Sequence, residues 1–311
     1  MSKSEALTGG VSRSVLAVDI GGTKVAAAVI SDCAEIEALE ISATSHLTPD
    51  ESLDEILTAI AQFRHGRAVE ACGIALPAIL DSGVVTYAAH NIPDWQGVSI
   101  RRLAEERLGI PCVAEFDGYA AALGEFWAGR ARGALDAAML IVGTGVGGGI
   151  VHSGRLYRGR TAVAGGIGWM RLVAGDELSE TLEDIASGPA IVSAARRGRP
   201  GEEDRYPNAE AVFAAAYARD PVAAAAVRRA VLSLGAAVGV LIDVLAPQIV
   251  VLGGGVGSRA DVVAPVRELG LAAAQPAARN LVRIEPAELG RLSSLYGAAY
   301  LAHLALQGKE P

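Results

Sequence analysis

Asp19–Lys24, with the sequence Asp-Ile-Gly-Gly-Thr-Lys, is the stretch that decides how this chain folds. An apolar run over residues 14–18 precedes it, and a second apolar run over residues 25–30 follows it. Two apolar runs of this length that are joined by a tight glycine turn predict a β-hairpin with buried strands.

The turn also carries the groups that a nucleotide phosphate needs. Gly21 and Gly22 allow positive φ and close approach of the backbone, and their N–H groups can form a concave anion site. Thr23 adds a hydroxyl, and Lys24 is the only lysine outside the two tails of the chain. Asp19 can hold a hydrated Mg²⁺, which binds few protein carboxylates. An ordinary hairpin turn is the alternative, and a second glycine turn later in the chain favours the phosphate interpretation.

Length, composition and charge narrow the class of protein. A chain of 311 residues, 51% hydrophobic and 20% charged, is globular and long enough for two lobes. The net charge of −8 and the absence of a long basic run argue against nucleic acid as a partner.

Cysteine usage and the apolar runs bear on the compartment. Cys33, Cys72 and Cys112 form no CxxC pair, so the sequence predicts neither a disulfide framework nor a zinc knuckle. The polar N-terminal residues 1–14 lack the apolar core of a signal peptide. The longest apolar run, residues 230–242, is too short to span a bilayer and predicts a buried helix. A cytoplasmic protein without a membrane partner is expected.

A weak internal repeat organises the chain. Residues 137–142 form an apolar run, residues 143–149 a glycine-rich turn, and residues 150–152 a returning strand. This repeats the opening hairpin and predicts two lobes of related topology that face each other across a cleft, where α/β proteins bind ligands.

The rest of the chain alternates between helical and extended patterns, which predicts an α/β fold. Apolar periodicity predicts helices over residues 52–63, 100–108, 119–127, 182–187, 189–196, 209–218, 222–245, 261–274 and 295–306. Short apolar runs predict strands over residues 70–76, 111–115, 155–157 and 248–252. The polar segment 197–208 contains two prolines and predicts an exposed loop.

A third glycine motif, at residues 253–255, follows the last of these strands. The three glycine motifs, in this order, resemble those of the ROK family of sugar kinases within the actin/hexokinase-like ATPases, and the resemblance runs over residues 15–302. It implies a two-lobed actin/hexokinase-like (ribonuclease H-like) fold with an interlobe cleft. The expected small lobe is residues 1–116 with 292–311, and the expected large lobe is residues 117–291.

The resemblance implies that ATP and Mg²⁺ bind in the cleft and that Asp117 is the general base for an attacking hydroxyl. An N-cap on the following helix is the other reading of Asp117. Asp19 would hold Mg²⁺ through water, and Gly254 and Gly255 would line the adenosine side. The residues expected to hold phosphates are Gly21, Gly22, Thr23, Lys24, Gly143, Thr144 and Gly145.

The acceptor side departs from the family pattern. Phe116 stands where the family has an asparagine, and Gly166 and Trp169 stand where it has a glutamate and a histidine that contact the sugar. Glu183 matches a further sugar-contacting glutamate. His90 and Asn91 remain as candidates for acceptor hydroxyls.

These departures predict a changed acceptor, because apolar groups in place of hydrogen-bonding ones alter specificity. The expected acceptor is an aminosugar, a deoxysugar or a cyclitol rather than glucose. The family histidine is also a zinc ligand in many members, and residues 175–181 contain no cysteine. No structural zinc is therefore expected.

Two other classes compete with a kinase. A catalytically inactive sugar-binding sensor or scaffold would explain the lost polar contacts, but it would not need Lys24, Asp117 and two phosphate turns. A ROK transcriptional repressor would need a DNA-binding domain, and only 18 residues precede Asp19. A cytoplasmic homodimer that acts on a sugar-like small molecule is the expectation.

Overall fold

The computed structural model describes residues 13–22, 24–43, 49–88, 95–172 and 180–310. They divide into two compact units, residues 1–116 with 298–310 and residues 117–297. The chain passes from one unit to the other between residues 116 and 117 and again between residues 297 and 298. The functional lobes expected from the sequence stay a prediction.

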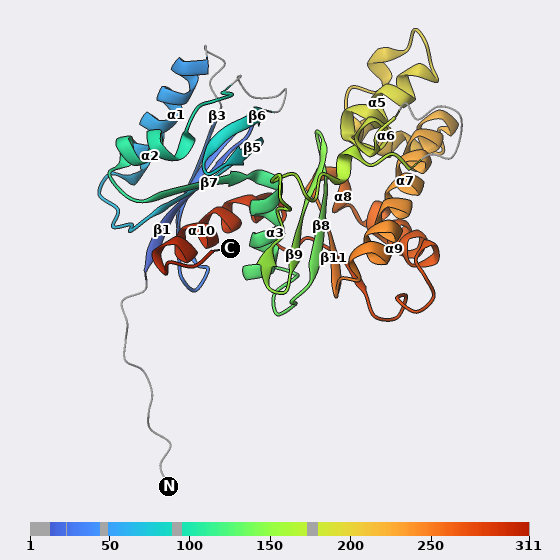
Figure 1. The fold of residues 1–311 in the computed structure, drawn as a ribbon. Helices are drawn as coiled ribbons and strands as arrows, with labels where there is room; N and C mark the ends of the chain where they lie inside the picture. Colours follow the sequence, from blue (N-terminus) through green and yellow to red (C-terminus); the bar gives the residue numbers. More distant parts are fainter. Residues whose placement is uncertain (1–12, 23, 44–48, 89–94, 173–179, 311) are drawn as a thin grey trace. The chain divides into compact units, whose positions relative to one another are not determined.

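The first unit is built on a five-stranded sheet in the order β3-β2-β1-β4-β7 (Figure 1). β1 pairs antiparallel with β2, so the hairpin predicted around the first glycine turn is confirmed. β4 is parallel to β1, and β7 is parallel to β4. The strands are β1 (Ser14–Ile20), β2 (Lys24–Ser31), β3 (Ile36–Ala43), β4 (Cys72–Leu76) and β7 (Cys112–Phe116).

Helices cover both faces of this sheet. α1 (Pro49–Arg64) and α2 (Ile100–Leu108) bury their apolar sides against the face that carries Ile74. Gly73 points to the opposite face, where a Cβ would lie 1.8 Å from the carbonyl oxygen of Ala298 on α10 (Ser293–Leu306). The backbone of α10 therefore rests directly on the sheet. A small hairpin, β5 (Ala78–Asp81) with β6 (Val84–Ala88), completes the unit.

The second unit repeats the first sheet, strand for strand, in the order β10-β9-β8-β11-β12. Its hairpin strands are again antiparallel, and the next two strands are again parallel to the first. The internal repeat seen in the sequence is therefore a repeat of topology. The strands are β8 (Ala137–Val142), β9 (Val146–His152), β10 (Arg155–Leu156), β11 (Ile249–Gly253) and β12 (Arg283–Pro286).

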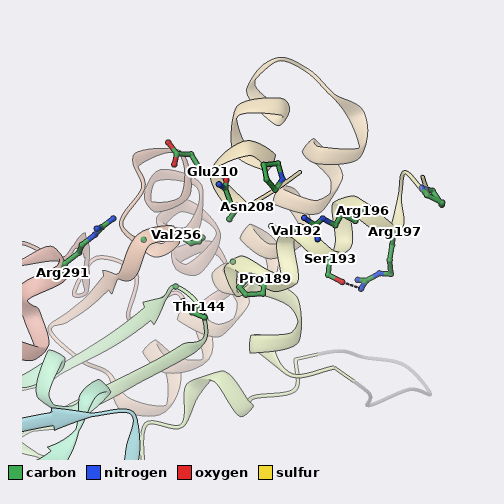
Figure 2. A pocket seen from close by; sticks show the side chains of 16 residues that line it. Thr144, Pro189, Val192, Ser193, Arg196, Arg197, Asn208, Glu210, Val256 and Arg291 are labelled. Atoms are coloured by element: carbon green, nitrogen blue, oxygen red, sulfur yellow. Dashed lines mark hydrogen bonds between the residues drawn. The ribbon is translucent and has the colours of Figure 1, made fainter. Parts of the chain in front are cut away.

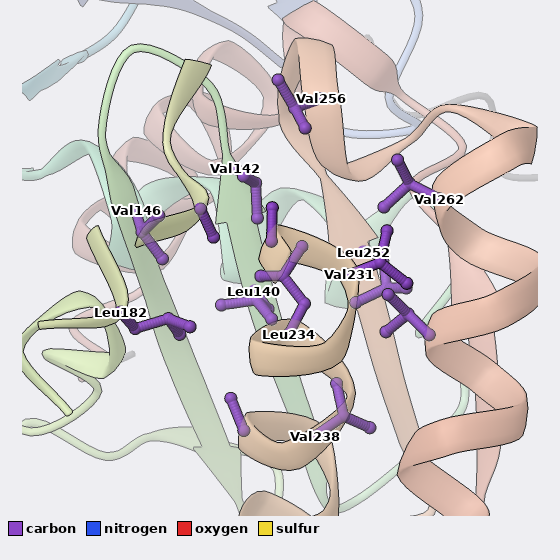
Figure 3. Close-up of a cluster of buried hydrophobic side chains, with 14 of the residues drawn as sticks. Leu140, Val142, Val146, Leu182, Val231, Leu234, Val238, Leu252, Val256 and Val262 are labelled. Atoms are coloured by element: carbon purple, nitrogen blue, oxygen red, sulfur yellow. The ribbon is translucent and has the colours of Figure 1, made fainter. Parts of the chain in front are cut away.

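The core of the second unit lies between this sheet and a layer of helices. Leu140 and Leu252 of the sheet pack with Leu234 and Val238 of α7 (Pro221–Leu245), as Figure 3 shows. α3 (Asp117–Trp127) covers the other face, because a Cβ on Gly149 of β9 would lie 2.7 Å from the Ala122 side chain. The helices are α3 (Asp117–Trp127), α4 (Leu182–Ala186), α5 (Gly188–Arg197), α6 (Ala209–Tyr217), α7 (Pro221–Leu245), α8 (Gly254–Gly257) and α9 (Ala260–Ala273), with 3₁₀ turns η1 (Ile167–Trp169), η2 (Glu203–Arg205) and η3 (Gly290–Leu292).

Among the described residues, α7 is the one helix that is long and apolar enough to cross a bilayer. Of its most apolar window, 56% is buried inside the protein. A core helix has this same composition, and α7 packs against α4, α5, α6 and α9.

Two predictions from the sequence need correction. β9 begins at Val146, so the second glycine turn is shorter than the predicted 143–149. The segment 197–208 is also not simply an exposed loop, because Tyr206 is fully buried and its hydroxyl donates to Asp220 at 3.0 Å.

Burial by itself raises the pKa of Asp220, but donors from the Ala223 and Val222 backbone, from Tyr206 and from Arg199 hold it well below its usual range.

Candidate active site

The first glycine turn joins β1 to β2. The Gly21 N–H donates to the Lys24 carbonyl at 2.8 Å, and a Cβ on Gly21 would lie 3.1 Å from the same oxygen. Asp19 is half-buried near the end of β1, and Lys24 is exposed at the start of β2. The backbone of Gly21 and the Lys24 side chain are thus held on one tight turn. Thr23 lies outside the described residues.

The second glycine turn joins β8 to β9 and is closed by a bond from the Gly143 N–H to the Gly145 carbonyl at 2.9 Å. Thr144 at its tip is exposed. The turn is anchored from outside by Gly188, whose N–H donates to the Gly143 carbonyl at 2.8 Å. Glu183 anchors its exit, because one carboxylate oxygen accepts the Val146 N–H at 2.8 Å.

The third glycine motif lies at the end of β11. Gly254 has φ +81°, and a Cβ there would lie 2.3 Å from the Val142 carbonyl oxygen, so only glycine fits. Gly255 faces open space, since a Cβ on it would meet nothing within 4 Å. Gly254 is therefore needed by the backbone, whereas Gly255 leaves room for a ligand.

A hollow of about 1130 Å³ lies in the second unit and brings the second and third glycine motifs together (Figure 2). Gly143, Thr144 and Gly255 line it, as do Pro189 and Val192 of α5. Gly254 and Gly145, which were also predicted to belong to the site, are the neighbours in sequence of Gly255 and Thr144. The remaining lining residues are Gly188, Ser193, Arg196, Arg197, Pro200, Pro207, Asn208, Ala209, Glu210, Val256 and Arg291.

The wall of this hollow is cationic, although the whole chain has a net charge of −8. Three arginines and one glutamate line it. Arg196 donates to the Tyr206 carbonyl at 3.1 Å, and Arg197 donates to the Ser193 hydroxyl at 2.8 Å (Figure 2). In the described part of the chain, Arg291 forms no hydrogen bond or ion pair, and Figure 2 shows it on the side away from Arg197. An anionic ligand fits this charge distribution.

Sequence reasoning missed these arginines. Arg196 and Arg197 lie in the last turn of α5, and Arg291 lies in η3. No motif marks them, because positions that are nearly a hundred residues apart meet only in the folded unit. The glycines could be located because each glycine motif is one continuous stretch of sequence.

Asp117 is the first residue of α3, and Phe116 is the last residue of β7, so no loop separates them. The Phe116 N–H donates to the neighbouring Glu115 side chain at 2.9 Å, and the strand register places Phe116 opposite Leu76. Asp117 is therefore the residue at which the chain enters the second unit. Asp19 and Lys24 belong to the first unit and Asp117 to the second.

The other predicted acceptor residues lie in the second unit or outside the described residues. Gly166 directly precedes η1, and Trp169 ends it with 70% of its side chain exposed. Glu183 lies in the first turn of α4. His90 and Asn91 fall outside the described residues.

The fold and these glycine turns define a protein of the actin-like ATPase class, and comparison with known proteins supplies the family. The model of the ROK family matches residues 15–305. The chain is 31% identical to a glucokinase from Streptomyces coelicolor, over 92% of this chain and 96% of that protein. It is 32% identical to a kanosamine kinase from Amycolatopsis mediterranei, over 95% of this chain and 98% of that protein.

A solved structure agrees with these relatives. The ROK family glucokinase from Streptomyces griseus, in complex with glucose and AMPPNP, superposes with a TM-score of 0.79 and is 33% identical. The match covers 93% of this chain and 99% of that one. The chain belongs to the ROK family, which confirms the resemblance and the α/β fold inferred from its sequence.

Proposed function

We propose that this protein transfers the γ-phosphoryl group of ATP to a hydroxyl of an aminosugar, a deoxysugar or a cyclitol, with Asp117 as the general base. The broader class is that of a ROK family sugar kinase. The acceptor, the base and the metal are the proposed parts.

The hollow in the second unit is the observation that supports ATP as the phosphoryl donor. Pro189, Val192 and Val256 give it apolar walls that suit a nucleobase, while arginines and the second glycine turn suit phosphates. Arg291 lines the same hollow as Thr144 of the second glycine turn, and we assign it to the phosphate end. A guanidinium there can bind phosphate oxygens in a bidentate manner. Lys24 of the first turn is the other cation that the family resemblance assigns to the phosphates.

Magnesium fits the residues at the first turn. Among the described residues no group of three His, Cys, Asp or Glu side chains could form a protein cage for a metal. Mg²⁺ in kinases instead keeps several waters and is held by one or two carboxylates and the phosphates, which Asp19 at the end of β1 can provide. Bound there, Mg²⁺ would neutralise charge on the transferred group.

The proposed acceptor follows from three residues. Phe116, Gly166 and Trp169 supply no carboxylate, amide or imidazole for a glucose hydroxyl, whereas Glu183 still does. An acceptor that lacks or replaces some hydroxyls leaves fewer polar groups without partners in such a pocket. The kanosamine kinase among the relatives supports an aminosugar.

An acceptor panel tests the proposal. Glucose, kanosamine, other aminosugars, deoxysugars and cyclitols are each offered with ATP and Mg²⁺, and ADP release is measured. The expected result is release that depends on one acceptor class, with glucose a poor substrate. Efficient use of glucose with no better acceptor contradicts the changed pocket. If no acceptor stimulates ADP release, the protein is a sensor rather than a kinase.

A further inference from the structure

Val146, the first residue after the second glycine turn, is in contact with other segments through both its N–H and its carbonyl group. Its N–H donates to a carboxylate oxygen of Glu183 at 2.8 Å. Its carbonyl lies against Gly168 of η1, where a Cβ would be only 2.0 Å from the oxygen. The exit of the donor-side turn therefore contacts the segment that carries the acceptor-side Trp169.

Glu183 is itself held in place by the start of α4. Thr181 caps this helix in a capping box with Asp184, in which the Thr181 N–H donates to the Asp184 carboxylate at 2.9 Å. The N–H of Leu182 donates to the Met170 carbonyl, directly after η1, at 2.8 Å. α4 thus connects the end of η1 to the glycine turn through short, fixed bonds.

Gly145 shows that the carboxylate shapes the turn. Its φ lies outside the left-handed region, so backbone conformation does not require glycine there. A Cβ on it would lie 2.6 Å from the same Glu183 oxygen that accepts the Val146 N–H. Glycine at this position makes room for the carboxylate. In the described part of the chain, the other Glu183 oxygen has no hydrogen-bond partner.

The family resemblance already places Glu183 at the acceptor, and we propose that it is also a positioning residue, which holds the exit of the second glycine turn through the carboxylate oxygen that accepts the Val146 N–H. This inference rests on the proposed kinase function. An acceptor hydroxyl on the second oxygen fixes the side chain and with it the Val146 N–H and the turn. Backbone N–H groups that are already in place bind the phosphates of the nucleotide more tightly. Binding of the sugar acceptor therefore promotes binding of ATP.

Four variants test this role in the full-length protein. Glu183→Ala removes the acceptor of the Val146 N–H, whereas Glu183→Gln keeps an oxygen that can accept it. Gly145→Ala leaves Glu183 in the chain but displaces its carboxylate. Glu180→Ala is the matched control, because this nearby carboxylate pairs with Arg229 and does not touch the turn. The readouts are AMPPNP-Mg²⁺ affinity by calorimetry, amide exchange of Val146 by NMR, and a melting curve.

We expect faster Val146 exchange and about tenfold weaker AMPPNP binding, equivalent to about 1.4 kcal/mol, in Glu183→Ala and Gly145→Ala. Without sugar, Glu183→Gln and Glu180→Ala should keep the Val146 exchange rate and the AMPPNP affinity near those of the wild type. The double variant that combines Glu183→Ala with Gly145→Ala should bind AMPPNP no more weakly than the single variants do, because both changes act through one contact. Kanosamine or glucose should tighten AMPPNP binding in the wild type but not in Glu183→Ala.

Three results would overturn the inference. They are unchanged exchange and affinity in Glu183→Ala, an equal loss in Glu183→Gln, or fully additive losses in the double variant. These readouts need no turnover, so they separate this inference from the kinase proposal. A wild type that binds AMPPNP as described but phosphorylates no sugar would contradict the proposed function alone.

Discussion

At the scale of single residues, Asp117 is the position that we propose as the general base. We predict that Asp117→Asn lowers turnover by about 10²–10⁴-fold, because the amide keeps the size of the side chain but cannot accept the proton. Nucleotide binding should stay near wild type, since the hollow that we assign to the donor is lined by other residues. Steady-state ADP release and AMPPNP titration measure the two effects. Near wild-type turnover would show that another group is the base.

The acceptor side allows a gain-of-function test. The triple variant Phe116→Asn, Gly166→Glu and Trp169→His returns three polar groups to the predicted pocket. Glucose phosphorylation relative to the best native acceptor should rise at least about tenfold, or about 1.4 kcal/mol, if one good hydrogen bond is regained. Competition between the two acceptors in one assay measures this ratio directly.

The backbone should tolerate this triple change. Gly166 has φ −68°, an ordinary value for any residue, although a Cβ would lie 3.3 Å from the Val163 carbonyl oxygen. Trp169 is mostly exposed, so its replacement opens no cavity. An unchanged melting curve with an unchanged acceptor ratio would contradict the assigned pocket.

At the scale of elements, α3 and α10 cross at two glycines that leave no room for a side chain. A Cβ on Gly297 would lie 1.6 Å from the Ala120 carbonyl oxygen, and one on Gly124 would lie 2.0 Å from the Ser293 carbonyl oxygen. Backbone atoms of both helices would have to move apart to accept a methyl group. We predict that Gly297→Ala lowers the free energy of unfolding by about 3 kcal/mol or more.

Urea unfolding measures this loss, and Gly255→Ala is the matched control. The same substitution at Gly255 adds a Cβ that meets nothing within 4 Å, so stability should change little. Equal stability of the two variants would show that the α3–α10 crossing adapts.

The elements that the sequence predicted are those with a buried, periodic side. α2 begins and ends as expected, with Ser99 at its N-cap and Gly109 in the left-handed conformation at its C-cap. β3 was missed because almost all of its side chains are exposed, so no apolar run marks it. β12 was also missed, because it is short and has one fully buried side chain, Ile284.

The candidate site divides in a similar way. Glycines at a turn report a local backbone requirement, so the three glycine motifs could be located from sequence. The apolar and cationic wall around them depends on tertiary packing between α5, α6 and η3 and has no local pattern. Tyr206 was missed for the same reason, since its partner Asp220 is a helix N-cap distant in sequence.

At the scale of the whole molecule, His303 links stability to pH. Burial lowers the pKa of His303 below its usual value, and the Ile30 backbone and the Asp32 and Glu70 carboxylates only partly oppose this. A group with a lowered folded-state pKa binds its proton more readily in the unfolded chain. Its contribution to stability is therefore present above about pH 6.5, its ordinary value, and is lost as the pH falls below it.

We predict that the free energy of unfolding falls between about pH 6.5 and pH 5, and that His303→Gln makes this fall shallower. Denaturant titrations across this range measure both slopes. His65, an exposed histidine at the end of α1, gives the matched control in His65→Gln. Identical slopes in the wild type and both variants would exclude His303 as the source.

Metal content is a second property of the whole protein. The paired loss of the family histidine at Trp169 and of cysteines over residues 175–181 predicts that the purified protein carries no stoichiometric zinc. Elemental analysis and a melting curve with a chelator measure this. About one zinc per chain, or a melting temperature lowered by the chelator, would refute the prediction.

The placement of the hollow has a consequence for how such proteins diversify. Its wall comes entirely from residues 143–291, and none of Phe116, Gly166 and Trp169 lines it. Substitutions at these three positions therefore leave the wall of the hollow chemically unchanged. If this hollow holds ATP and those three positions face the acceptor, as we propose, a lineage can change its sugar through a few codons while its nucleotide site keeps the same residues. New acceptor preferences can then arise in this architecture without loss of the ancestral donor.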